Sequence, residues 1–202
     1  MKHASTRAVF SYWNERRGGR PAPARADIDP VGIRHALGDT FLLSADFVDQ
    51  LRFRLAGTRI CALFGREIKG EILSDLWSEK SRQAMQDILS IVTDETSGAV
   101  TGLTGRAEDG ATLDLEMLLL PLARSGHART GVLGVLVAPA PPYWIGEKPV
   151  VEVALNTVRH LGADADHLTA PRLAPAAEAG ELRHGFTVYS GGLAEPSSER
   201  SA

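Results

Sequence analysis

The first twenty residues carry apolar side chains at the three- and four-residue spacing of an amphipathic helix. The positions that share this face are Thr6, Val9, Phe10 and Trp13. Gly18 and Gly19 interrupt the pattern and are expected to end the helix. The basic, proline-containing stretch that follows, up to residue 26, has no interleaved aromatic residues. We therefore expect a solvated linker there rather than a patch that binds RNA or lipid.

A short helix is predicted over residues 30–37. Asp29 precedes it and can accept hydrogen bonds from the free N–H groups of the first turn. Pro30 suits the first helical position, where its missing N–H costs nothing, and Gly38 suits the position after the last. The chain is therefore expected to turn into its first strand directly after Gly38.

Two strands are predicted next, in the segments 39–47 and 50–57. In the second strand, apolar Leu51, Phe53 and Leu55 alternate with arginines, which is the period of two that a half-buried strand shows. This alternation predicts that all three apolar side chains point to the same face of a sheet.

The period changes after Gly57. Thr58 can cap a short helix that Gly65 ends, and brief turns are expected between residues 66 and 77. Ser78 can cap a longer helix over residues 79–96, which Gly98 ends. The apolar face of this helix is formed by Met85, Ile88 and Val92, with Ala84, Leu89 and Ile91 beside them.

The last third of the ordered chain reads as three antiparallel strands. Asp109-Gly110 is a turn signal between two extended runs and predicts a hairpin, and the apolar run 131–138 predicts a buried strand. Pro121 cannot donate to a ladder and should mark a bulge or an edge. Asp114 and Glu116 share one face of the hairpin's second strand, which we expect to be solvated.

The C-terminal region is less regular. Residues 150–162 contain β-branched residues and should dock on the domain, but their pattern fits a strand or a helix equally well. Residues 163–202 are rich in Ala, Pro, Glu, Ser and Gly, and we expect most of this tail to be disordered. Residues 186–189, Phe-Thr-Val-Tyr, are one short apolar spot within the tail that could bind as a peptide.

Composition limits the classes of function. The chain has 202 residues and a formal net charge of -3, so it has the length for one domain with tails and no bulk positive field for nucleic acid. Its single cysteine excludes an internal disulfide and a multi-thiolate zinc site. No signal peptide or apolar stretch of membrane-spanning length is present, so we expect a soluble, cytoplasmic protein.

The order of elements and several local motifs resemble the PAS fold, and one family of stand-alone bacterial PAS proteins in particular. The matching features are Trp13, the segment 27–37, the segment 52–58, the segment 65–70 and Trp77. The resemblance implies an α+β domain over residues 27–162, with a five-stranded antiparallel sheet and short helices on one face. It also implies a sensory or protein-interaction module, with signalling proteins such as histidine kinases as partners.

The residues argue against the cofactors of better-known PAS domains. Blue-light PAS domains form a flavin adduct through a cysteine after the glycine that ends the short helices, whereas Cys61 lies one helix earlier and is expected to pack as a small apolar residue. Haem-binding PAS domains use a histidine, commonly on the longer helix, and residues 79–96 contain none. His35 and His127 lack recognisable partner groups, and residues 160–167 offer histidines and aspartates without a rigid frame for a metal.

No nucleophile or acid–base pair stands at a spacing that indicates catalysis, so we do not expect an enzyme. A pocket in the PAS core remains open as a hypothesis, because a filled core needs the same apolar side chains as a ligand cavity. The candidate lining residues are Leu51, Phe53, Leu55, Ile60, Phe64, Trp77, Leu115, Met117, Leu119 and Val135.

The opposite face of the sheet carries its own apolar residues. Leu118 and Leu120 point away from the core set, and a sheet with one solvated face should not show them. The N-terminal helix, through Val9, Phe10 and Trp13, is the expected cover, supplied either by the same chain or by a partner subunit in a homodimer. Two functions follow: a regulatory module that acts by protein contact, or a sensor or carrier of a small apolar or aromatic ligand.

Overall fold

The structure is a computed structural model that describes residues 1–48, 50–123, 131–161, 181–183 and 186–188. The chain divides into a large unit, Met1–His167, and a second unit, Leu168–Ala202. Within the described part of the chain, no helix combines the length and the apolar character needed to cross a membrane.

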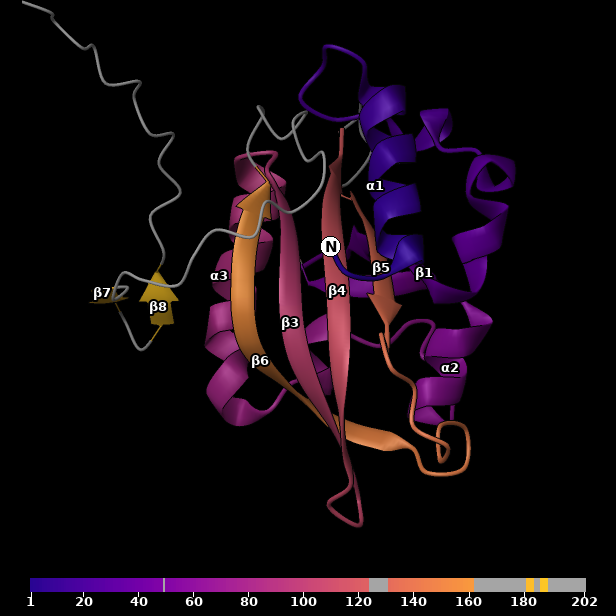
Figure 1. Ribbon diagram of the computed structural model, residues 1–202. Coiled ribbons are helices and arrows are strands. Elements are labelled where there is room, and N and C mark those ends of the chain that lie inside the picture. The colour runs from indigo at the N-terminus through magenta and orange to yellow at the C-terminus, as the bar shows by residue number, and fades with distance from the viewer. Residues whose placement is uncertain (49, 124–130, 162–180, 184–185, 189–202) are drawn as a thin grey trace, which may run out of the picture. The chain divides into compact units, whose positions relative to one another are not determined.

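The large unit is one antiparallel sheet covered by helices on both faces (Figure 1). Its helices are α1 Ala4–Arg17, η1 Arg25–Asp27, η2 Pro30–Asp39, α2 Thr58–Phe64, η3 Leu73–Leu76 and α3 Glu79–Asp94, where η marks a 3-10 helix. Its strands are β1 Thr40–Ala45, β2 Leu51–Ala56, β3 Gly98–Ala107, β4 Thr112–Leu122, β5 Gly131–Val137 and β6 Val150–Leu161. The spatial order of the strands is β2-β1-β5-β4-β3-β6.

The α+β prediction is confirmed, but the sheet has six strands and not five. The sixth is β6, formed by the segment for which the sequence left strand and helix open. β6 pairs along almost the whole of β3. Short helices lie on one face as predicted, and the N-terminal helix α1 covers the other face together with η2.

The two apolar layers follow from the period of two along β4. Leu113, Leu115, Met117 and Leu119 face α2, η3 and α3, and we call this side the inner face. Leu118 and Leu120, which alternate with them, pack against α1 and η2 on what we call the outer face. Figure 1 shows α1 along β4 and β5, and α3 on the side of β3 and β6.

Several helix ends lie close to their predicted positions. Asp29 caps η2 by accepting a hydrogen bond from the Val31 N–H at 3.0 Å, although η2 runs on through Gly38 to Asp39. Gly18 ends α1 with a positive φ of 56°. The cap of α2 is Gly57, one residue before the predicted Thr58.

Other boundaries were misplaced. Ser78 precedes α3 as predicted, but its hydroxyl donates to the hydroxyl of Ser81 and not to the helix backbone. Gly98 opens β3 and does not end α3, which already ends at Asp94. Pro121 pairs with Val132 of β5 on one side. On the other side, the last β4 residue that pairs with β3 is Leu119. Pro121 therefore lies where β4 has a paired strand on one side only.

Gly57 brings together the two segments that carry the PAS resemblance. A Cβ at this position would lie 2.2 Å from the carbonyl oxygen of Leu37, so only glycine permits so close an approach to the end of η2. The Gly57 N–H also donates to the carbonyl of Thr40 at 2.9 Å. This contact places Arg59, two residues later, against Asp39.

The second unit contains two short paired strands, β7 Glu181–Arg183 and β8 Phe186–Val188. The apolar spot of residues 186–189 therefore includes β8, and Tyr189 lies outside the described residues. Apart from β7 and β8, residues 163–202 lie outside the described residues, so the predicted disorder of this segment stays a prediction.

Candidate functional site

The inner face holds most of the residues predicted to line a pocket. Phe53, Ile60, Phe64, Trp77, Leu115, Met117 and Leu119 are buried in one apolar cluster, and Leu51 packs against it half-buried. The cluster spans the sheet and the helices α2, η3 and α3. Two of the ten candidates lie elsewhere.

Leu55 is a correction. It is 46% exposed, because the β1–β2 register shifts between Leu42 and Leu43. Leu43 pairs with Phe53 and Leu42 pairs with Leu55, which leaves Arg54 as an extra residue. An extra residue in one strand turns the following side chains to the other face, so Leu55 leaves the face that Phe53 occupies.

Val135 is the second correction. It is fully buried, but in the cluster of the outer face, between Leu133 and Val137 of the same strand. The inner face of β5 is formed by Val132, Leu136 and a glycine. When every residue of a strand is apolar, the sequence does not show which residues point to which face of the sheet. The inward-facing residues of β5 could therefore not be predicted from the sequence.

Among the described residues, the side chains of the inner face are closely packed. One internal void, of about 10 Å³, lies among Phe41, Phe53, Phe64, Leu73, Leu76, Trp77, Leu103, Met117, Leu136 and Val153. This volume is near the lower limit for a single water molecule and far below that of a ligand pocket. The Trp77 indole N–H, in this lining, is buried and has no hydrogen-bond partner among the described residues.

The outer face is covered by the same chain. Val9 of α1 and Leu118 and Leu120 of β4 are fully buried together in the outer cluster. The Trp13 indole N–H donates to the carbonyl of Pro121 at 2.8 Å, and Phe10 stacks on Trp13 with the ring centroids 6.4 Å apart. The five residues proposed as an interface therefore contact one another within one chain, which removes the reason to infer a dimer from them.

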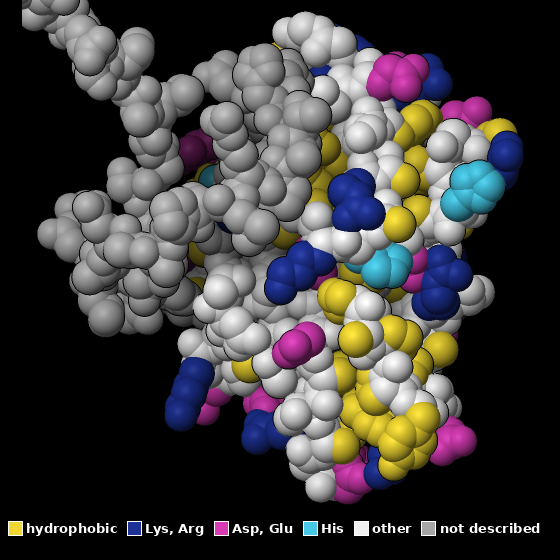
Figure 2. Space-filling view, in the orientation of Figure 1, with side chains coloured by type: hydrophobic (Ala, Val, Ile, Leu, Met, Phe, Trp, Pro, Cys, Tyr) yellow, Lys and Arg dark blue, Asp and Glu magenta, His cyan; other side chains and the backbone are white. Residues whose placement is uncertain are grey.

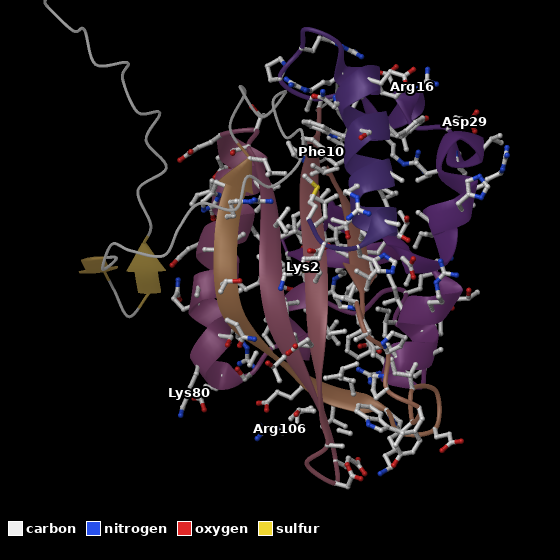
Figure 3. The ribbon with its side chains drawn as sticks, in the orientation of Figure 1. Lys2, Phe10, Arg16, Asp29, Lys80 and Arg106 are labelled. Carbon is white, nitrogen blue, oxygen red and sulfur yellow. The ribbon has the colours of Figure 1, made fainter. Side chains whose placement is uncertain are left out.

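Two buried carboxylates hold the start of α1 on the sheet. Glu116, which was expected to be solvated, is 6% exposed and accepts hydrogen bonds from the N–H groups of Lys2 at 2.6 Å and His3 at 3.1 Å. Asp39 is 5% exposed and accepts from the Ser5 hydroxyl at 2.6 Å. Figure 3 shows Lys2 in front of β4 and Phe10 on α1.

These bonds set the charge of both carboxylates. Burial alone would raise the pKa of Glu116, but hydrogen bonds from the Lys2 and His3 N–H groups outweigh it, and the pKa is lowered. Burial also opposes ionisation of Asp39, and its bonds to Arg59 and Ser5 lower its pKa in the same way. Both groups therefore act as anions that fasten α1.

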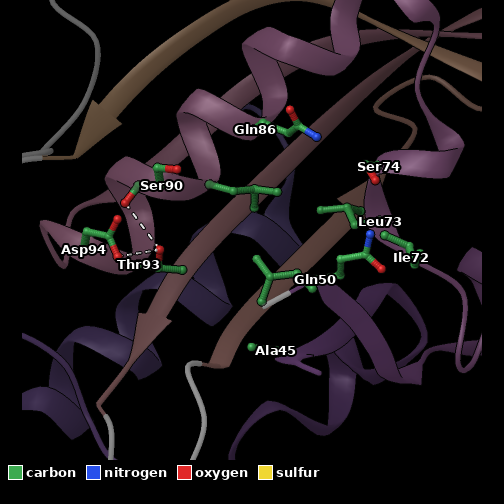
Figure 4. Close-up of a pocket in the computed structure, with 11 residues that line it drawn as sticks. Ala45, Gln50, Ile72, Leu73, Ser74, Gln86, Ser90, Thr93 and Asp94 are labelled. Atoms are coloured by element: carbon green, nitrogen blue, oxygen red, sulfur yellow. Dashed lines mark hydrogen bonds between the residues drawn. The ribbon is translucent and has the colours of Figure 1, made fainter. Parts of the chain in front are cut away.

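A half-open cleft of about 480 Å³ lies where α3, η3 and the ends of β1 and β2 meet (Figure 4). Its lining residues are Ala45, Gln50, Leu51, Ile72, Leu73, Ser74, Gln86, Leu89, Ser90, Thr93 and Asp94. Leucine side chains line it together with amide, hydroxyl and carboxylate groups. The adjoining β1–β2 turn presents Phe47 and Val48, which are 94% and 72% exposed.

Reactive and metal-binding groups are few. Burial and the nearby Glu67 carboxylate raise the pKa of the Cys61 thiol, which disfavours the reactive thiolate. His35 is exposed, and His127 lies outside the described residues. In the described part of the chain no three His, Cys, Asp or Glu side chains gather as a metal site, and most of the segment 160–167 lies outside that part.

A family model described as a PAS domain matches residues 1–137, which is more than half of the chain. This chain belongs to the PAS domain family. The resemblance to the PAS fold is thus confirmed, and PAS domains commonly serve as sensory modules in signal transduction. Comparison with curated proteins gave no match.

Three similar solved structures are PAS or light-oxygen-voltage domains. A domain from a flavin-analogue study of the light-oxygen-voltage mechanism is 13% identical, with a TM-score of 0.44 over 54% of this chain and 82% of that chain. The PAS domain of a Colwellia psychrerythraea protein is 16% identical, with a TM-score of 0.39 over 55% and 97%. A PAS domain from a two-component sensor histidine kinase is 15% identical, with a TM-score of 0.38 over 52% and 88%.

Sequence reasoning missed the two buried carboxylates and the cleft. Glu116 stands between apolar neighbours on β4, and its place on the face of Leu118 and Leu120 was a signal that it needed partners once that face was covered. Asp39 gave no such signal, because its role depends on Arg59, which lies twenty residues away in the sequence.

Proposed function

We propose that this PAS domain is a regulatory module that acts through contact with other proteins in bacterial signal transduction. The observation that supports the proposal is the close packing of the inner face, where the void among Phe41, Trp77, Met117 and their neighbours is about 10 Å³. Its output would then depend on surface contacts, with cytoplasmic signalling proteins such as histidine kinases as the partners. No catalytic activity is part of this proposal.

The surface we favour is the cleft of α3 together with the β1–β2 turn. Recognition surfaces combine exposed aromatic and aliphatic side chains with a polar rim. Phe47 and Val48 supply the former, and Gln50, Gln86 and Ser90 supply the latter. A partner side chain that enters the cleft would meet the leucines between these polar groups.

The test places a photo-crosslinking amino acid at Ser90 in one variant and at Lys80 in another. Both positions are exposed on α3, and only Ser90 lines the cleft. Each variant is expressed in cells that contain candidate histidine kinases, and the products are identified by mass spectrometry. We expect a kinase adduct from Ser90 and little from Lys80, whereas equal labelling from both positions would contradict the use of the cleft.

A second candidate function is the binding of a small apolar or aromatic ligand inside the core. The observation that favours it is the Trp77 indole N–H, a buried donor that a ligand or a water molecule would satisfy. The residues around it would have to move apart, because the present void is small. In this case ligand binding would shift the protein between two arrangements of the core.

Native mass spectrometry and an absorption spectrum of one purified sample test this candidate. A bound mass that is lost in Trp77→Phe, which keeps an aromatic ring but removes the donor, would support a core ligand. A clean mass of the chain alone with no absorption band in the visible range is what the first proposal expects.

A further inference from the structure

A further surface hollow, of about 310 Å³, lies beside α2, and Leu136 lines both this hollow and the void of the core. Its lining residues are His3, Ser5, Asp39, Arg59, Ala62, Leu63, Leu136, Val137, Ala138, Pro141 and Ile145. Figure 2 shows hydrophobic side chains gathered on this part of the surface, with basic side chains and a histidine beside them. The hollow therefore has an apolar wall and a polar end.

The polar end has spare donors and few spare acceptors. Both carboxylate oxygens of Asp39 are used, because they accept from Arg59 Nε at 2.5 Å and Nη2 at 2.8 Å, and from the Ser5 hydroxyl. Arg59 remains 59% exposed, and its Nη1 makes no hydrogen bond to a described residue. His3 accepts the Ser5 N–H at Nδ1, 3.2 Å away, so its neutral ring carries a proton on Nε2 and can donate there.

The buried Asp39 carboxylate also fixes the orientation of the Arg59 guanidinium, which it holds at Nε and Nη2. A guanidinium held at two points by a buried partner loses little conformational entropy when it binds an anion. Carboxylates match the planar donor edge of arginine, and such charge-assisted bonds are among the stronger hydrogen bonds. The remaining wall offers leucine, isoleucine and proline side chains for an apolar body.

We propose that this hollow binds a small carboxylic acid with an apolar or aromatic body. The carboxylate lies at Arg59 and His3, and the apolar body lies against Leu63 and Ile145. The volume is at the lower end of the range for ligand pockets, so the acid has one ring or a short chain. The site shares Leu63 and Leu136 with the inner cluster, has no lining residue in common with the cleft of α3, and would let a metabolite contact both α1, through His3, and α2.

The probe is phenylacetate, titrated into the full chain while the methyl signals of Leu63 and Ile145 are followed by NMR. Phenylacetamide, which has the same shape without the charge, is the matched ligand. We expect saturable shifts with the acid and about tenfold weaker binding of the amide, the ratio that one charge-assisted hydrogen bond provides. No saturable shift, or equal binding of the two compounds, would overturn the proposal.

Two variants locate the site. Ala62→Trp fills the hollow from an exposed position on α2, and Ala8→Trp makes the same change at an exposed position on α1 outside the hollow. We expect Ala62→Trp to lose phenylacetate binding and Ala8→Trp to keep it. Binding that survives in Ala62→Trp places the acid elsewhere and would also overturn the proposal. The comparison of phenylacetate with phenylacetamide uses the unmodified chain, so it tests the proposal even if Ala62→Trp does not fold.

Discussion

At the residue scale, Gly134 is a position where the core has no space for an added atom. A Cβ there would lie 2.0 Å from the ring of Phe41, which is 1% exposed and cannot move into solvent. We expect Gly134→Ala to lower the free energy of unfolding by about 1–3 kcal/mol, the usual effect of overpacking. Gly131→Ala is the control, because its nearest contact would be 3.5 Å away, and we expect a change within about 0.5 kcal/mol. Urea denaturation measures both, and equal midpoints would contradict the close packing of Phe41 on β5.

Glu116 and Asp39 link stability to pH at the same scale. Their pKa values are lowered in the folded chain, so the unfolded chain binds more protons in acid. The stability that they contribute is present above their unfolded pKa values, near 4, and is lost as the pH falls through the lower folded values. We expect Glu116→Gln to weaken the dependence of unfolding on pH below about pH 5, measured by denaturation at several pH values. Asp114→Asn, an exposed change on the same strand, is the control, and identical pH profiles for the two variants would refute the role of Glu116.

At the scale of elements, α1 is the cover of the outer face and not a separate arm. Removal of residues 1–20 would expose Leu118, Leu120 and Val135, which are fully buried in the intact chain. We expect the truncated chain to bind the dye ANS and to aggregate, because a contiguous apolar face becomes open to water. Val9→Asp in the full chain tests the same contact with a single buried charge and should show the same trend. A truncated chain that stays soluble with unchanged oligomeric state would show that α1 is dispensable.

The elements also show where sequence reasoning reaches its limit. The helical period of α1, the cap at Asp29 and the turn at Gly110 are local signals, and each predicted its element. The face to which Leu55 points depends on a bulge in β2, and the face to which Val135 points depends on the register of β5. Both are set by pairing between segments that are distant in the sequence. β6 shows the same limit. Its residues form a strand because they pair with β3, and the sequence pattern of β6 alone does not specify a strand. The two buried carboxylates could not be predicted for the same reason, because only the fold brings Asp39 and Glu116 to the start of α1.

At the scale of the whole molecule, helices of the same chain bury the two apolar clusters of the sheet in the described residues, so neither cluster is open to a second copy. Among the surfaces of the described residues, the cleft of α3 and the hollow beside α2 are half-open and partly polar. We therefore expect the mass of one chain in light scattering coupled to gel filtration, over a wide range of protein concentration. Val9→Asp tests whether the covered outer face is what keeps the chain monomeric. Exposure of the outer face in this variant should convert the monomer into larger assemblies. A stable dimer of the unmodified chain would contradict the expectation, and cross-linking at Ser90 would then show whether the cleft holds the second copy.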